Sequence, residues 1–210
     1  MVPGLAVQGY ARVAVTALSD AGFDAELMDP PAWRGVPAEL DAYGRQLGQR
    51  LREHDHPTAV LVGLSVGTQA AAVAAAAAGD QVRQLLLVSP TVDPSKRHRW
   101  RLLSAWLHGE DHRDSPPLRG QIRDWRHAGV SRIYRGLTSA VRVRLEDVLP
   151  DVTAQITVVH AEADRLTAHP YAVRLAEEND ARLLLAPDAP HSWPTGDAER
   201  FVTLISELAG

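Results

Sequence analysis

Residues 59–67 read AVLVGLSVG, and residues 68–78 directly after them read TQAAAVAAAAA. The run from Ala59 to Leu64 is continuously apolar, which is typical of a strand in a parallel sheet that is covered on both faces. The second segment is almost entirely alanine, the residue with the highest helix propensity, and its small side chains allow a helix to lie close to a sheet. The two segments therefore predict a buried strand, a tight turn and a helix.

Four further apolar runs have strand length, and turn-rich or helical stretches follow each of them. They are Phe23–Met28, Val82–Val88, Ile156–His160 and Arg182–Ala186.

Amphipathic helices are predicted between and after these runs. In residues 37–53 the apolar side chains recur at spacings of three and four, which places them on one helix face. Residues 201–208 carry a similar stripe. Alternating strands and helices predict an α/β fold, a three-layer sandwich with a mostly parallel sheet.

Length and composition suit one soluble domain over residues 1–210. The chain is 45% hydrophobic and 23% charged, with a formal net charge of −4. It has no cysteine, which excludes disulfides, thiolate metal sites and cysteine nucleophiles. No apolar run is long enough for a membrane span, and the N-terminus has no signal-peptide pattern, so we expect a cytoplasmic protein.

Residues 94–147 interrupt the alternation of strands and helices. The segment is too long for a simple connection and contains three of the five tryptophans, Trp100, Trp106 and Trp125. We expect a helical lid inserted over the sheet, with these tryptophans either lining the apolar part of a pocket or forming the core of the lid.

The pentapeptide Gly63–Gly67 has the pattern G-x-S-x-G between a strand and a helix. Such a turn would force Ser65 into a strained backbone conformation that lifts its hydroxyl above the sheet. Side chains at positions 63 and 67 would collide with the neighbouring strand or helix. The helix N-terminus behind Ser65 would offer N–H groups to a developing oxyanion. Ser65 is therefore the candidate nucleophile.

A serine hydroxyl needs a base to take its proton, and the base needs a carboxylate to hold it in the right tautomer. In this strand–turn–helix context the chain order is serine, acid, histidine. His191 follows the last predicted strand and is the candidate base. His160 lies at the end of a strand, where it could instead be a packed, hydrogen-bonded residue.

Asp164 is the candidate acid, because it lies just beyond the carboxyl end of the fourth run, where sites in parallel sheets collect. Glu162 is a weaker alternative on the same turn. Asp93 also follows a strand end and could reach the same histidine.

These motifs resemble those of the α/β-hydrolase superfamily over nearly the whole chain. Gly63–Gly67 is similar to its nucleophile elbow, Ala161–Asp164 to its acid turn and Pro190-His191 to its histidine loop. Met1–Leu5 resembles the loop that carries an oxyanion donor, and Met28–Pro31 the turn after the following strand. The resemblance implies that the backbone N–H groups of Leu5 and Val66 form the oxyanion hole.

The sequence departs from the family pattern at its start. The family normally has two or more strands before the oxyanion loop, whereas here that loop begins at residue 1. We therefore expect the N-terminal strands of the fold to be missing, with the third strand reduced to Met1 and Val2.

The expected activity is hydrolysis of an ester or thioester through an acyl-Ser65 intermediate. Acyl transfer or elimination on the same scaffold is the alternative enzymatic reading. The alternative outside the enzymes is a hydrolase-like binding protein without catalytic activity, because a fold does not determine a function.

No cofactor, metal, nucleic-acid or membrane partner is expected. His108 and His112 are four residues apart, but no second ligand pair has zinc-like spacing. The expected partner is a small acyl substrate. Between Lys96 and Arg144 lie 12 basic and four acidic residues, a net charge of 12 − 4 = +8. This asymmetry favours an anionic or carrier-borne substrate, although such arginines also occur on solvated helix faces.

Overall fold

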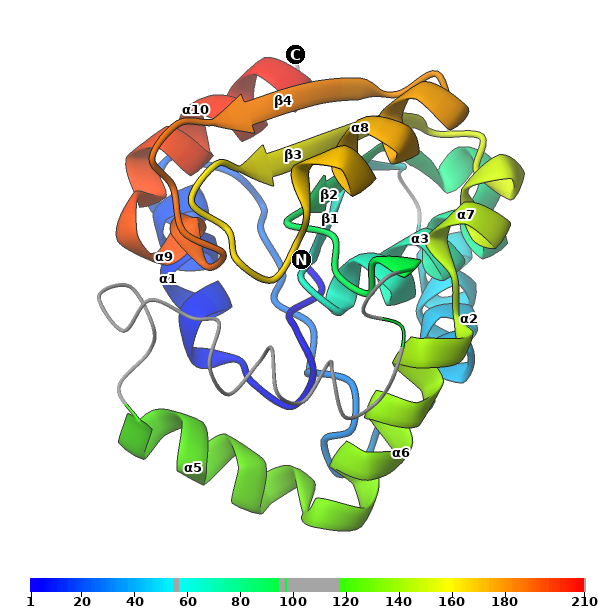
Figure 1. Cartoon of the computed structure of the whole chain (residues 1–210), viewed down its shortest axis with the longest axis vertical. Helices are drawn as coiled ribbons and strands as arrows, with labels where there is room; N and C mark the ends of the chain where they lie inside the picture. The colour runs from blue at the N-terminus through cyan, green and yellow to red at the C-terminus, as the bar shows by residue number, and fades with distance from the viewer. Residues whose placement is uncertain (55–56, 95–96, 98–117, 210) are drawn as a thin grey trace.

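A computed structural model describes residues 1–54, 57–94, 97 and 118–209. Four parallel strands form its sheet, in the spatial order β1-β2-β3-β4 (Figure 1). The strands are β1 (Thr58–Leu64), β2 (Val82–Val88), β3 (Gln155–Ala161) and β4 (Arg182–Ala186). The predicted α/β class with a parallel sheet is confirmed, and four of the five apolar runs are strands.

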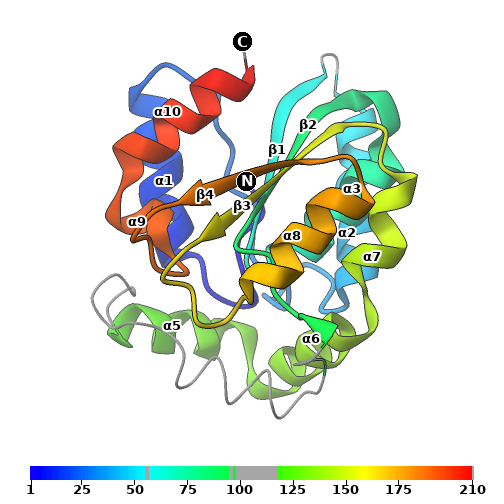
Figure 2. The ribbon, with the colours of Figure 1, turned by 45° about the horizontal axis from the view of Figure 1, so that its top comes forward.

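Helices cover both faces of this sheet (Figures 1 and 2). On one face lie α3 (Gly67–Ala78), α7 (Leu145–Val148) and α8 (His169–Glu178), and α2 (Leu40–Arg52) packs against α3. The other face packs against α1 (Gly9–Asp20), α9 (Trp193–Gly196) and α10 (Ala198–Ala209). Each face has its own buried apolar cluster, as expected of a three-layer sandwich.

The alanine-rich α3 lies between the sheet and α2, and small residues on α2 allow the close approach. A Cβ atom added to Gly44 would lie 2.7 Å from the Ala70 carbonyl oxygen, and one added to Gly48 would lie 2.7 Å from that of Ala74. The nearest side chains of α3 are Val73 at Gly44 and Ala77 at Gly48, so the two glycines leave room for α3 at this contact. The polyalanine segment is therefore explained by packing as well as by helix propensity.

The predicted strand at Phe23–Met28 is wrong: this segment belongs to no strand and forms no ladder. It exchanges two hydrogen bonds with Met1, from the Met28 N–H to the Met1 oxygen at 3.0 Å and from the Met1 amino group to the Glu26 oxygen at 2.6 Å. A ladder needs a partner that runs alongside for several residues. Among the described residues, Met1 alone takes this place.

Val2 lies at the edge of β1 that faces away from β2 and forms one parallel bridge with Gly63. Its N–H donates to the Val62 oxygen at 2.7 Å, and its oxygen accepts the Leu64 N–H at 3.0 Å. Residues 1–2 thus occupy the place beside β1 that the resemblance assigns to the third strand. This bridge brings the N-terminal segment directly beside the turn that carries Ser65.

Two helices of the 94–147 segment lie beyond the carboxyl ends of the strands (Figure 2). They are α5 (Leu118–Ala128) and α6 (Val130–Arg142). The single-turn 3₁₀ helices Gly79–Gln81 and Leu149–Asp151 complete the described elements. None of the described helices is long and apolar enough to cross a membrane.

Polar side chains on α6 and α5 bond to backbone groups of the N-terminal third of the chain. Arg132 donates to the carbonyl oxygens of Ala32 at 3.0 Å and Trp33 at 2.7 Å. The buried carboxylate of Asp124 accepts the Gln8 N–H at 3.0 Å. Buried side chains with satisfied polar groups hold a fixed geometry better than solvated surface contacts do. These two helices therefore have a defined position over the end of the sheet.

Candidate active site

The turn between β1 and α3 holds Ser65 in a left-handed conformation, with φ +57°. Such a conformation costs energy in a residue other than glycine and is often found at functional positions. A Cβ on Gly63 would lie 2.6 Å from the Thr68 Cα, and one on Gly67 would lie 2.5 Å from the Val2 oxygen. The strain at Ser65 and the need for both glycines are as the pentapeptide predicts.

The structure brings Ser65, His191 and Asp164 into one hydrogen-bonded chain. The His191 Nε2 lies 2.8 Å from the Ser65 Oγ, and the His191 Nδ1 lies 2.8 Å from the Asp164 Oδ2. The side chain of His191 is 5% exposed and that of Asp164 is 0% exposed. Both hydrogen bonds are therefore shielded from competing water, which strengthens them.

The surroundings of Asp164 favour its ionised form. Burial alone would raise its pKa, but the neighbouring His191 and the N–H groups of Thr167 and Leu166 outweigh that effect and hold the pKa below its ordinary value. Those N–H groups donate to the Oδ1 at 3.0 Å and 2.7 Å. The second oxygen is left for the imidazole, so the carboxylate can orient the ring and stabilise an imidazolium.

The alternative acids and the alternative histidine have other surroundings. Glu162 is exposed on the same turn. Asp93 is buried beside α8, where burial raises the pKa of Tyr171 and the charges of Glu146 and Asp93 raise it further. The ring of His160 is buried and packs against that of His169, with centroids 4.9 Å apart. Of the three candidate carboxylates, the structure brings Asp164 to His191.

The segment around Leu5 lies next to the nucleophile. A Cβ added to Gly4 would be 3.6 Å from the Ser65 Cβ. The Gly4 N–H donates to the Tyr10 hydroxyl at 2.5 Å, and Ala6 has a left-handed backbone with φ +57°. Within the described residues, the N–H groups of Leu5 and Val66 have no hydrogen-bond acceptor. Both donors are thus without a protein partner in the described part of the chain, which the oxyanion hole implied by the resemblance would require.

Tyr10 is a residue that the sequence did not single out. Nothing distinguishes it from the other three tyrosines until the fold places α1 under the Gly4 turn. Its buried hydroxyl supports the backbone on which Leu5 sits.

Of the tryptophans expected at the pocket, Trp100 and Trp106 lie outside the described residues. Trp125 is partly buried on α5 and packs against the apolar cluster that includes α1 and α10. His108 and His112 also lie outside the described residues. Among the residues that are described, no group of three or more histidine, aspartate or glutamate side chains could hold a metal ion.

No known family model and no curated protein matches this sequence. Solved structures do match. E-2-(acetamidomethylene)succinate hydrolase superposes with a TM-score of 0.74 at 18% identity, over 99% of this chain and 89% of that chain. A hydrolase from Oleispira antarctica gives a TM-score of 0.72 at 13% identity, over 99% and 89% of the two chains.

A lipase-esterase related protein from Clostridium acetobutylicum gives a TM-score of 0.72 at 14% identity, over 99% of this chain and 92% of that chain. At these identities the similarity concerns the fold, and all of these structures have one fold in common. The resemblance that Gly63–Gly67 predicts is therefore confirmed, and the chain has the α/β-hydrolase fold.

Proposed function

We propose that the protein is a serine hydrolase that cleaves an ester or thioester through an acyl-Ser65 intermediate. The observation that carries this proposal is the hydrogen-bonded chain from Ser65 through His191 to the buried, ionised Asp164. A serine with this environment is the activated nucleophile of acyl-transfer chemistry. The left-handed backbone of Ser65, which a binding role does not require, supports the same proposal.

In the acylation step, the neutral His191 takes the Ser65 proton at Nε2 while Oγ attacks the carbonyl carbon of the substrate. The carbonyl electron pair moves to its oxygen, and the N–H groups of Leu5 and Val66 stabilise the resulting oxyanion. When the tetrahedral intermediate collapses, the bond to the leaving alcohol or thiol breaks. The proton held by His191 goes to that leaving group.

In the deacylation step, water takes the place of the leaving group. His191 accepts one proton from the water as its oxygen attacks the acyl carbon, and returns that proton to Ser65 Oγ as the acid is released. Throughout, Asp164 remains a carboxylate that holds the ring and offsets its positive charge. An alcohol or amine that replaced the water would turn the same cycle into acyl transfer.

A fluorophosphonate probe tests this proposal, because only an activated serine reacts with it at an appreciable rate. We expect stoichiometric labelling of the wild type, mapped to Ser65, and a burst of p-nitrophenol from p-nitrophenyl acetate. An inert wild type that is folded by circular dichroism would contradict the proposal in favour of a binding role. Adding an acceptor alcohol then separates hydrolysis from transfer by the products formed.

We further propose that α5 and α6 belong to a lid over Ser65, formed by residues 94–147, and that the substrate is anionic. Seven arginines and one acidic residue lie in residues 118–144, and that one acid, Asp124, is buried. Arg126 and Arg142 are exposed and have no carboxylate partner among the described residues. An excess of arginine over acidic residues raises the local concentration of anions, and arginine can bind a carboxylate or phosphate.

The anionic preference is tested by comparing kcat/KM for a neutral thioester and a matched thioester that carries a carboxylate. We expect the anionic substrate to be favoured at low salt and the preference to fall as salt is added. The double variant Arg126→Gln/Arg142→Gln should reduce the preference without changing the rate with the neutral substrate. Equal rates for both substrates at low salt would contradict the proposal.

In this proposal Trp125 contributes apolar surface beside the acyl chain.

A further inference from the structure

The loop after β2, residues 89–93, contributes no group to the chain from Ser65 to Asp164, yet it is strained in the same way as the nucleophile turn. Ser89 has φ +49° and Val92 has φ +67°. Strain of this kind persists only where surrounding contacts impose it, and it collects at sites that depend on geometry. The contacts of this loop therefore show what the strain supports.

Ser89 is fully buried and contacts the histidine loop through its side chain. Its Oγ donates a hydrogen bond to the carbonyl oxygen of His191 at 3.0 Å, and its backbone N–H donates to the Val159 oxygen at 2.9 Å. The carbonyl of the preceding residue, Val88, accepts the Ser65 N–H at 3.0 Å. Two consecutive residues thus join the nucleophile turn, β3 and the histidine loop.

The next residue in the loop reaches the acid turn. The Pro90 oxygen accepts a hydrogen bond from the Thr167 hydroxyl at 3.0 Å. The backbone N–H of the same Thr167 donates to the Asp164 Oδ1 at 3.0 Å. Residues 88–90 therefore make contact with all three segments that carry the serine, the acid and the histidine.

We propose that Ser89 is a positioning residue whose hydroxyl holds the His191 backbone so that the ring stays within reach of Ser65. The inference rests on the proposed function. Asp164 restrains the ring at Nδ1, whereas the Ser89 hydroxyl restrains the main chain from which the ring projects. Without that hydroxyl, the buried carbonyl of His191 loses a donor and the loop is free to shift. A misplacement of about 1 Å in a reacting group can cost on the order of 100-fold in rate.

The left-handed backbone of Ser89 provides a way to separate positioning from stability. Ser89→Gly and Ser89→Ala both lack the hydroxyl, but glycine adopts φ +49° without strain and alanine does not. Ser89→Gly should therefore be the more stable of the two, as measured by Tm. If the hydroxyl positions His191, both variants should lose about 10- to 100-fold in kcat, with KM within about two-fold of the wild type.

Asp188→Gly is the matched control. Asp188 is exposed, lies in the same loop as His191 and has a left-handed φ of +55°. Its replacement by glycine loosens the loop backbone and leaves the Ser89 hydroxyl in place. We expect kcat of this variant within about two-fold of the wild type, since a surface substitution away from buried contacts has a small effect.

The kinetic result and a proton NMR result together decide the proposal. The Nδ1 proton of His191, bonded to Asp164, should exchange with water faster in both Ser89 variants than in the wild type, because the histidine loop opens more readily once the Ser89 hydroxyl is removed. If kcat follows Tm instead, falling in Ser89→Ala and recovering in Ser89→Gly, the hydroxyl has only a structural role. Should the wild type turn over no ester, the proposed function fails. The exchange rate of the His191 Nδ1 proton then tests the role of Ser89 alone, and the same rate in the wild type and the Ser89 variants would overturn the inference.

Discussion

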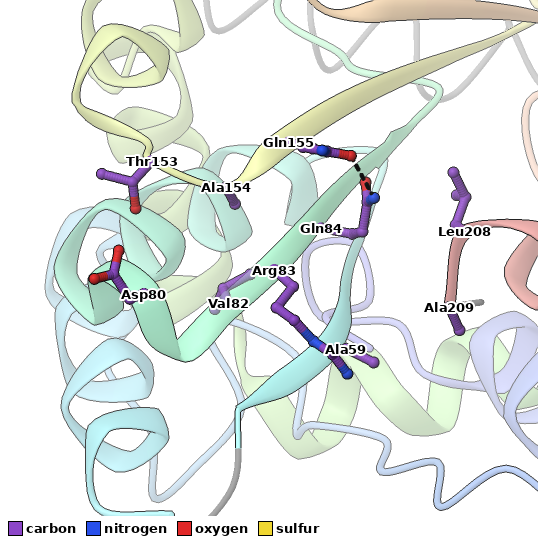
Figure 3. Close-up of a pocket in the computed structure, with 10 residues that line it drawn as sticks. All are labelled: Ala59, Asp80, Val82, Arg83, Gln84, Thr153, Ala154, Gln155, Leu208 and Ala209. Atoms are coloured by element: carbon purple, nitrogen blue, oxygen red, sulfur yellow. Dashed lines mark hydrogen bonds between the residues drawn. The ribbon is translucent and has the colours of Figure 1, made fainter.

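The two ends of the sheet use the same four strands but place very different side chains on them. At the carboxyl end, each strand is followed by a polar residue of the site: Ser65 after β1, Ser89 after β2, Asp164 after β3 and His191 after β4. At the amino end lies a shallow pocket of about 440 Å³ lined by residues such as Arg83, Gln84 and Gln155 (Figure 3). In it, Gln84 donates to Gln155 at 2.8 Å on the exposed surface.

Left-handed backbone occurs at both ends of the sheet. At the amino end, Gly79 before β2 adopts φ +60° without cost, and Asp180 before β4 has φ +48°. The left-handed positions after β1 and β2 are Ser65 and Ser89, where a side chain is kept in spite of the strain. The two ends therefore differ in the buried, convergent hydrogen bonds that accompany the left-handed residues at the carboxyl end, and a pocket alone is a poorer indicator of a site.

The sharpest test of this difference is Ser65→Ala. If the carboxyl end is the active site, this change should lower kcat for a short p-nitrophenyl ester by about 10⁴- to 10⁶-fold, as expected for loss of a triad nucleophile. The fold should persist, because alanine removes only the hydroxyl. Equal rates for wild type and variant would remove Ser65 from the mechanism.

Asp164→Asn should be the next most severe change, with a loss on the order of 10⁴-fold in kcat, because an amide holds His191 in the wrong tautomer. Asp93→Asn is the comparison, since Asp93 also follows a strand at the same end. It lies beside Tyr171, so it should affect stability more than turnover. Both rates should be normalised to labelled active sites, and the reverse ranking would assign the acid to Asp93.

Gly67→Ala should destabilise the carboxyl end without removing any catalytic group. Its Cβ would meet the backbone oxygens of Val2 and Pro3, neither of which can rotate away as a flexible side chain can. Overpacking of this kind costs about 1–3 kcal/mol. For a domain of this size Tm falls by about 2–4 °C per kcal/mol. Thermal unfolding followed by circular dichroism measures the effect, and an unchanged Tm would show that the turn relaxes freely.

His160 should make the stability of the protein depend on pH. Burial lowers its pKa, and the nearby His169 lowers it further although the charge of Asp164 opposes this. The unfolded chain therefore binds a proton near pH 6.5 that the folded chain binds only at lower pH. Stability should fall as the pH drops from 7 to 5, and His160→Phe should reduce that fall, with His169→Phe as the control. A Tm profile unaffected by His160→Phe would contradict this assignment.

The smallest effect is expected at the amino end. Gln84→Ala removes the hydrogen bond to Gln155 from an exposed surface, and such changes alter the free energy of unfolding by at most about 0.5 kcal/mol. The rate of ester hydrolysis should be that of the wild type. A large loss of activity in this variant would show that the pocket in Figure 3 communicates with the site and would remove the contrast between the two ends.

Periodicity and spacing within the sequence were sufficient for much of the fold. Continuous apolar runs predicted four of the strands, and the polyalanine segment predicted the helix α3, which can lie close to the sheet. The segment Phe23–Met28 has the same local pattern but no ladder, because a strand is defined by its neighbour and the neighbour here is Met1. Local sequence cannot report the length of a partner strand.

For the candidate site, the sequence by itself determined which residue types could act and in which order they follow their strands. Ser65 was identified by the glycines around it, and His191 and Asp164 by their places after strand ends. The sequence left Asp164, Glu162 and Asp93 as alternatives, because all three follow a strand. Only the tertiary structure decided among them, since the 2.8 Å contact between Asp164 and His191 joins residues of two loops 27 positions apart.

The supporting contacts were decided by the tertiary structure alone. Tyr10 reaches the Gly4 turn because α1 packs against the sheet, and Ser89 reaches the His191 carbonyl across 102 positions of chain. A hydroxyl carries no local signal of the backbone group to which it will bond. The partners of such side chains depend on how loops from different strands converge, and that convergence exists only once the parallel sheet has brought the four carboxyl ends together.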